Sequence, residues 1–151
     1  MKKITICDKT ALHCTRVLRT ENKTKVVSEI TEALSNLNKN ISLAKLDILI
    51  NSQNKKHKNK NFNFHVIKNS LPNNSFIKIN SQISIVCPEL LLIQLARTLS
   101  FEKLCLIALE FCGTYSIREE IQTFQSDVLP ITTAKSINNY LKIFTATHEN
   151  F

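Results

Sequence analysis

The stretch that decides the fold is LPNNSFIKINSQISIVCPELLLIQLARTLSFEKLCLIALEFCGTYSI, residues 71–117. After a Leu-Pro-Asn-Asn turn, two short apolar runs, Phe76–Ile79 and Ile83–Val86, flank a polar Asn-Ser-Gln segment, which predicts a β-hairpin. Pro88 then suits the first turn of a helix, where its missing N–H is not needed. That helix is apolar almost all round, as is typical of a central position.

A second helix is predicted over Phe101–Cys112, with Ser100 as its N-terminal cap and one apolar face. Gly113 follows it and is the only glycine among 151 residues. A lone glycine at a helix end indicates a left-handed position after the last turn. Other residues enter that conformation at a cost of about 1 kcal/mol.

Outside this stretch, hydrophobic periodicity predicts further elements on both sides. They are helices at Lys9–Arg19 (capped by Asp8 or Thr10), Thr24–Leu37 and Thr133–Ala146, and strands at Leu46–Ile50 and Phe62–Ile67. Because short turns join the four strands, we expect a mainly antiparallel four-stranded sheet. The fold class is therefore α+β, with an N-terminal helical pair and C-terminal helices. We expect a single domain over 1–151, divided into 1–40 (helical pair), 41–87 (sheet) and 88–146 (helices).

The composition fits a globular protein, with 43% hydrophobic and 21% charged residues. Five cysteines form an odd set with no secretory segment ahead of them, which favours a reducing cytoplasm. The longest strongly apolar run, Leu90–Ala96, is far shorter than the ~20 residues of a membrane span. We expect a soluble protein that does not enter a membrane.

The net charge of +8 is unevenly distributed. Residues 1–60 hold 13 Lys and Arg against 5 Asp and Glu, whereas residues 101–151 hold 4 against 6. All of the positive excess therefore lies in the first part of the chain. Such a gradient suits contact with a polyanion, although solubility alone would also account for it.

A cluster of lysines lies between the two predicted strands at Leu46–Ile50 and Phe62–Ile67. Its members are Lys55, Lys56, Lys58 and Lys60. Long cations on a loop can contact phosphates with little sequence preference, which makes these lysines the best candidates for nucleic-acid binding. The alternative is a solvated hairpin tip without function.

The N-terminal helical pair also permits a helix-turn-helix interpretation, because Arg16 and Arg19 lie near the turn. The turn lacks glycine and the first helix is short. A helical cap on the sheet is the alternative, since any amphipathic pair has this appearance.

No enzyme signature appears in the sequence: it has no glycine-rich phosphate loop, HExxH, GxSxG or CxxC. Five carboxylates fall on different elements, and none of them pairs with a lysine in the acidic-x-lysine arrangement of a metal-dependent nuclease: Asp8, Asp47, Glu89, Glu110 and Asp127. His65 lies on the side of its strand opposite the phenylalanines, which favours a hydrogen-bonded structural histidine over a general base. The cysteines are expected to be buried small hydrophobes. We therefore expect no catalytic residue, metal or cofactor.

Several motifs resemble a bacterial family related to AbiEi-type antitoxins of type IV toxin–antitoxin systems. In order, they are Leu71-Pro72, Cys87-Pro88-Glu89, Gln94-Leu95-Ala96 and Glu110-Phe111-Cys112-Gly113-Thr114-Tyr115. The segments DKTALHCTRVLR (8–19), LDILI (46–50) and FHV (64–66) resemble weaker family features, so the likeness covers most of the chain.

Many relatives in that family continue into a very-short-patch-repair-like endonuclease domain that holds the catalytic residues. This sequence ends shortly after LPITTAKSINNYL (129–141) and resembles the non-catalytic part alone. The resemblance therefore implies a non-catalytic, antitoxin-like regulator that touches DNA through its basic N-terminal half. The alternative is a protein-interaction module, or a remnant of a nuclease-associated protein, that docks on a separate toxin or nuclease through residues 105–117. An exposed apolar patch on the last two helices would favour this alternative.

Overall fold

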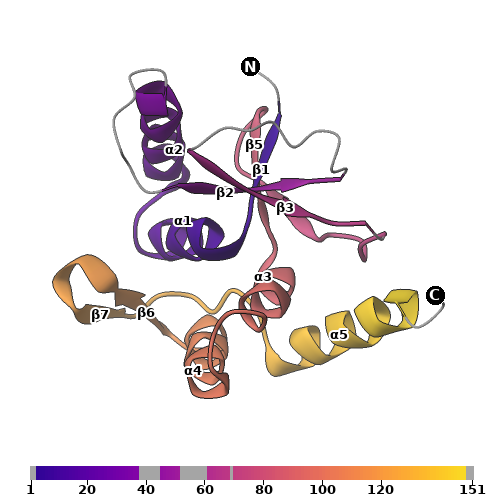
Figure 1. Cartoon of the computed structure of the whole chain (residues 1–151). Coiled ribbons are helices and arrows are strands. Elements are labelled where there is room, and N and C mark those ends of the chain that lie inside the picture. The colour runs from indigo at the N-terminus through magenta and orange to yellow at the C-terminus, as the bar shows by residue number, and fades with distance from the viewer. Residues whose placement is uncertain (1–2, 38–44, 52–60, 69, 149–151) are drawn as a thin grey trace. The chain divides into compact units, whose positions relative to one another are not determined.

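The structure is a computed structural model that describes residues 3–37, 45–51, 61–68 and 70–148 (Figure 1). Its residues group into two compact units. Unit 1 comprises Met1–Lys68 and Phe76–Val86, and unit 2 comprises Asn69–Ser75 and Cys87–Phe151. The described residues form five α-helices, a five-stranded mixed sheet and a two-stranded sheet, so the α+β class is confirmed. The single domain over 1–151 stays a prediction.

Unit 1 is built on a five-stranded sheet with the order β3-β2-β1-β5-β4. Its strands are β1 (Ile4–Ile6), β2 (Leu46–Ile50), β3 (Phe62–Val66), β4 (Phe76–Lys78) and β5 (Ile83–Val86). The pairs β1–β2 and β4–β5 are antiparallel, whereas β1–β5 and β2–β3 are parallel. The sheet thus has one strand more than expected and is mixed, because β1 inserts at its centre.

The pairing of β2 with β3 is parallel, not antiparallel as expected. Leu46 pairs with Phe62 and Ile50 with Val66, so both strands run in the same direction. The chain between them must connect the carboxyl end of β2 to the amino end of β3, as a crossover does. The hairpin expected at this point is therefore wrong, whereas the hairpin of β4 and β5 is confirmed.

The two helices of unit 1 confirm the predicted N-terminal pair. They are α1 (Asp8–Thr20) and α2 (Lys23–Leu37). Helix α2 begins one residue before Thr24, and its first turn is capped by Asn22, whose Oδ1 accepts a hydrogen bond from the Lys25 N–H at 2.9 Å. Asparagine is among the preferred N-cap residues, which explains why the helix begins before Thr24.

Helix α1 contacts α2, β2 and β5. Side chains from the strands and both helices form the buried core of unit 1, chiefly Ile6, Ala11, Cys14, Val26, Ile30, Ile48, Ile83 and Ile85. The buried isoleucines Ile6 and Ile48 are register partners. The apolar faces that the periodicity predicted are therefore the faces that pack.

Unit 2 contains three helices and a two-stranded ribbon. Its elements are α3 (Pro88–Leu95), α4 (Phe101–Cys112), β6 (Tyr115–Arg118), the short 3₁₀ helix η2 (Glu119–Ile121), β7 (Thr123–Ser126) and α5 (Ala134–His148). All three predicted helices are confirmed, with Pro88 at the first position of α3 and Ser100 as the cap of α4. The antiparallel ribbon of β6 and β7 was not predicted.

Gly113 does not have the left-handed conformation that the sequence predicted. Its φ of −95° and ψ of 177° are extended values that any residue adopts. Space is what requires glycine there: an added Cβ would lie 2.9 Å from the Leu109 carbonyl oxygen and 3.0 Å from the Tyr115 ring. The predicted conformation is wrong, and the glycine is explained by close packing at the turn from α4 to β6.

Candidate functional site

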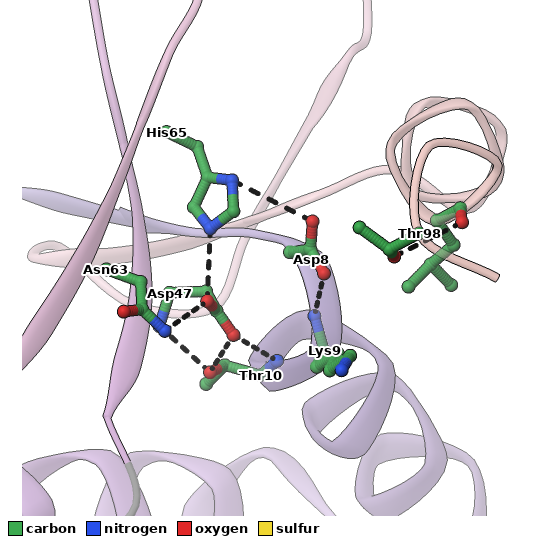
Figure 2. Close-up of polar contacts among 8 residues, drawn as sticks. Asp8, Lys9, Thr10, Asp47, Asn63, His65 and Thr98 are labelled. Atoms are coloured by element: carbon green, nitrogen blue, oxygen red, sulfur yellow. Dashed lines mark hydrogen bonds and ion pairs between the residues drawn. The ribbon is translucent and has the colours of Figure 1, made fainter.

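A cluster of polar side chains forms in unit 1 where β1 leads into α1 (Figure 2). Three elements contribute to it. Its members are Asp8 and Thr10 at the start of α1, Asp47 on β2, and Asn63 and His65 on β3. Asp8 and Asp47 are buried, with side chains 8% and 11% exposed, whereas the His65 side chain is 32% exposed.

Strand alternation explains why the β2 and β3 members share one face of the sheet. Asp47 and Asn63 are register partners, and His65 follows Asn63 by two residues. Phe62 and Phe64 occupy the opposite face of β3, with ring centroids 5.7 Å apart. The alternation that predicted a polar face on β3 is thus confirmed.

The Asp47 carboxylate caps helix α1 from the neighbouring strand. Cys7, the N-cap residue of α1, makes no side-chain cap. Instead, Asp47 Oδ2 accepts hydrogen bonds from the Thr10 N–H at 3.2 Å and the Thr10 hydroxyl at 2.9 Å. The Thr10 hydroxyl oxygen in turn accepts from the Asp47 N–H at 2.9 Å. A carboxylate at this position satisfies a free helix N–H and interacts favourably with the helix dipole.

The other oxygen of Asp47 is bound by β3. Asp47 Oδ1 accepts from Asn63 Nδ2 at 3.1 Å and from His65 Nε2 at 3.0 Å. Burial alone would raise the pKa of Asp47, but the hydrogen bonds from His65, Asn63 and Thr10 outweigh it and hold the pKa below its usual value. Asp47 is therefore ionised at neutral pH, with four donors directed at its two oxygens.

His65 lies between the two aspartates. Because a carboxylate can only accept, the bond to Asp47 fixes a proton on Nε2. The second ring nitrogen, Nδ1, lies 3.8 Å from Asp8 Oδ2, which is an ion-pair distance but too long for a hydrogen bond. A carboxylate that orients one imidazole nitrogen is the arrangement of an acid–base dyad, although here the other nitrogen faces a second carboxylate.

Asp8 has an unusual backbone for a residue at a helix start. Its φ of 50° lies in the left-handed region, which aspartate enters more readily than most residues. Its Oδ1 accepts a hydrogen bond from the Lys9 N–H at 2.8 Å. Two carboxylates thus accept hydrogen bonds from N–H groups in the first turn of α1. Asp8 does so from within the helix, and Asp47 does so from β2.

Sequence reasoning missed this cluster because its carboxylates lie on different elements. Asp8 is on α1 and Asp47 is on β2, yet the fold brings both carboxylates to His65. The hydrogen-bonded His65 was expected, but its partners were not. One signal was present: Asp47 interrupts the apolar strand LDILI, and a charged residue in a buried strand requires polar partners.

The predicted nucleic-acid residues are only partly described. Lys55, Lys56, Lys58 and Lys60 lie outside the described residues. Arg16 is buried in α1 at 8% exposure, and Arg19 in its last turn is half-buried. Burial leaves Arg16 little surface to offer a phosphate.

Other basic residues of unit 1 are exposed. The exposed lysines of its described residues are Lys3, Lys9, Lys23, Lys25, Lys45, Lys68 and Lys78. The exposed carboxylates of the same residues are Glu21 and Glu32, and Glu21 pairs with Lys25. Because Asp8 and Asp47 are buried in the polar cluster, the exposed charged residues of unit 1 have a larger positive excess than a count over its sequence indicates.

Unit 2 exposes apolar side chains instead. On α4 they are Phe101 (76% exposed), Leu106 (56%) and Leu109 (61%). The ribbon and its flanks expose Ile121, Phe124 and Leu129, and α5 exposes Leu141 and Ile143. Large apolar groups in such numbers on a small unit are typical of an interaction surface.

Within the described ranges, no group of three or more His, Cys, Asp or Glu side chains could hold a metal ion. All five cysteines are free thiols, and Cys7, Cys14 and Cys87 are buried. Burial raises the pKa of Cys14 to about 12 and that of Cys87 to about 11, so neither is a thiolate at neutral pH. None of the helices in the described part of the chain has the length and apolar character of a membrane span.

No family model matches this chain, and no curated protein and no solved structure is significantly similar to it.

Proposed function

We propose that this chain is a non-catalytic, antitoxin-like regulator that contacts DNA through its basic N-terminal half. The observation that carries the proposal is the segregation of charge. Residues 1–60 hold 13 basic residues against 5 acidic ones. Two of those five, Asp8 and Asp47, are buried, whereas the lysines among the described residues of unit 1 are exposed. A surface of this kind attracts phosphates by releasing counterions from the nucleic acid.

The test is fluorescence anisotropy with a duplex probe and a single-stranded probe over a series of salt concentrations. Each phosphate contact contributes about 0.9 to the slope of log affinity against log salt on duplex DNA. Replacing Lys55, Lys56, Lys58 and Lys60 by glutamine should flatten this slope and leave folding intact.

A matched control removes four exposed charges from unit 2. Its substitutions are Arg97→Gln, Lys103→Gln, Lys135→Gln and Lys142→Gln. This variant should retain the wild-type slope, since residues 101–151 are net acidic. If the wild type does not bind DNA even at ~50 mM salt, the DNA proposal fails. If both quadruple variants lose binding equally, net charge accounts for the affinity and the N-terminal half has no special role.

The second candidate is a protein-interaction module that docks on a separate toxin or nuclease protein. The exposed Phe101, Leu106 and Leu109 on α4 favour it. Leu106 and Leu109 are three residues apart and lie on the same side of the helix. Replacing both by serine should weaken binding to a purified candidate toxin or nuclease by at least tenfold and leave the salt slope on DNA unchanged.

A further inference from the structure

We propose that His65, placed between two buried aspartates, makes the junction between β3 and the start of α1 sensitive to pH near neutrality. The contact between β3 and the start of α1 is more stable when His65 is protonated and less stable when the ring is neutral. This inference concerns the polar cluster alone and holds whether or not the chain binds DNA.

Geometry provides the first argument. His65 Nε2 lies 3.0 Å from Asp47 Oδ1, and Nδ1 lies 3.8 Å from Asp8 Oδ2. The ring thus bridges β2 and the first residue of α1. Its side chain is 32% exposed, so it exchanges protons with solvent, whereas those of the two aspartates are 8% and 11% exposed.

The charge of the ring decides whether it can hold both aspartates. A neutral imidazole that donates from Nε2 to Asp47 presents a lone pair at Nδ1 to the Asp8 carboxylate. A protonated imidazole donates from both nitrogens and places a positive charge between two buried negative ones. Closing the 3.8 Å separation to hydrogen-bond distance would then draw β3 toward the start of α1.

Two other described groups of the cluster, Asp47 and Cys7, keep their protonation state near neutrality. Asp47 stays ionised, because its pKa is below the usual value. Cys7 stays a thiol, because burial and the charges of Asp47 and Asp8 raise its pKa far above the usual value. Asn63 on β3 and Thr10 on α1 carry no charge. Histidine is the side-chain type that ordinarily changes charge between pH 5 and 8, which makes His65 the member of this set to test.

The direction in which stability changes with pH follows from the two carboxylates beside the ring, which favour its charged form in the folded state. A histidine stabilised in its charged form contributes stability at pH values below about 6.5, its value in an unfolded chain. That contribution is lost as the pH rises through the titration of His65 in the folded protein. The junction should therefore be less stable at pH 8 than at pH 6.

Amide hydrogen exchange followed by NMR tests the proposal on the full chain. The reporters are the Ile67 N–H, bonded to the Ile50 oxygen, and the Leu46 N–H, bonded to the Asn61 oxygen. After correction for intrinsic rates, their protection should fall by up to about tenfold from pH 6 to pH 8. The Glu21 N–H, bonded to the Val17 oxygen at the other end of α1, should not change.

The variants separate His65 from other histidines. His65→Gln should abolish the pH dependence at both reporters, and Asp8→Asn should reduce it. His13→Gln is the matched control, because His13 also pairs with a carboxylate, that of Glu29 at 2.8 Å, but away from the cluster. It should retain the wild-type change. A wild-type chain with no change, or a change that persists in His65→Gln, would overturn the proposal.

A direct measurement covers the case in which His65→Gln does not fold. Nitrogen NMR of the His65 ring should show the proton on Nε2 at pH 8 in the wild type. The midpoint of the ring titration should be lower in Asp8→Asn than in the wild type. A ring protonated on Nδ1 at pH 8, or equal midpoints in the two proteins, would contradict the proposal.

Discussion

At the scale of single residues, Gly113 shows how a turn can require glycine without a left-handed backbone. Its side-chain position is filled by the Leu109 carbonyl oxygen and the Tyr115 ring. Below the turn, the fully buried Glu110 accepts hydrogen bonds from the Ile117 N–H at 2.8 Å and the Ser116 hydroxyl at 3.1 Å. The carboxylate ties α4 to β6, so the backbone cannot move away from an added methyl group.

Gly113→Ala should therefore destabilise the protein by about 1–3 kcal/mol, the usual cost of overpacking. Thr114→Ala, at the exposed neighbouring position, is the control and should change the free energy of unfolding by no more than about 0.5 kcal/mol. Urea unfolding measures both variants. A Gly113→Ala protein as stable as the wild type would show that the turn adjusts to the methyl group.

A second prediction about a single residue concerns the charge of Asp47. Because its pKa is lower in the folded protein than in an unfolded chain, it contributes stability above about pH 3.9 and loses it as the pH falls through the folded value. Asp47→Asn should cost about 1–3 kcal/mol at pH 6, since the amide NH2 must face either the Thr10 donors or the Asn63 and His65 donors. The difference from the wild type should shrink below about pH 4.

Urea midpoints at pH 6 and pH 3 measure this effect. Asp127→Asn is the matched control, because Asp127 is exposed and lies in unit 2. It should leave the midpoint nearly unchanged at both pH values. If Asp47→Asn lost the same amount of stability at pH 6 and at pH 3, the shape of the side chain and not its charge would account for the effect.

At the scale of elements, local patterns predicted most of the structure. The five α-helices were predicted because 3.6-residue periodicity and caps such as Ser100 are local signals. Strand β1 was missed because Ile4–Ile6 is too short to show alternation. The ribbon of β6 and β7 was missed because Thr123–Ser126 is mostly polar and exposed.

The direction of strand pairing could not be predicted from the same patterns. Alternation in Leu46–Ile50 and Phe62–Val66 determines which side chains share a face, but it is the same for parallel and antiparallel pairs. The polar cluster was missed for a related reason. Thr10 and Asp47 are 37 residues apart, and only the insertion of β1 between β2 and β5 brings the start of α1 to Asp47.

At the scale of the whole molecule, the proposed function requires that the chain have no nuclease activity of its own. The resemblance places catalysis in an endonuclease domain of the relatives, whereas the motifs of this sequence resemble the non-catalytic part. The two carboxylates that the fold does bring together bind a histidine and the first turn of α1. Asp47 already accepts four hydrogen bonds, so it has little capacity left for a metal ion.

We therefore expect the purified chain neither to nick nor to cut supercoiled or linear DNA in the presence of magnesium or manganese. Agarose gels of a supercoiled plasmid detect a single nick, which makes the measurement sensitive to a trace of activity. Contaminating nucleases are distinguished by a variant, since only cleavage by this chain would disappear when one of its own carboxylates is replaced. Asp8→Asn is the substitution to use, because asparagine also tolerates the left-handed backbone at position 8. Cleavage that survives further purification and is lost in Asp8→Asn would identify the polar cluster as an active site and end the regulator proposal.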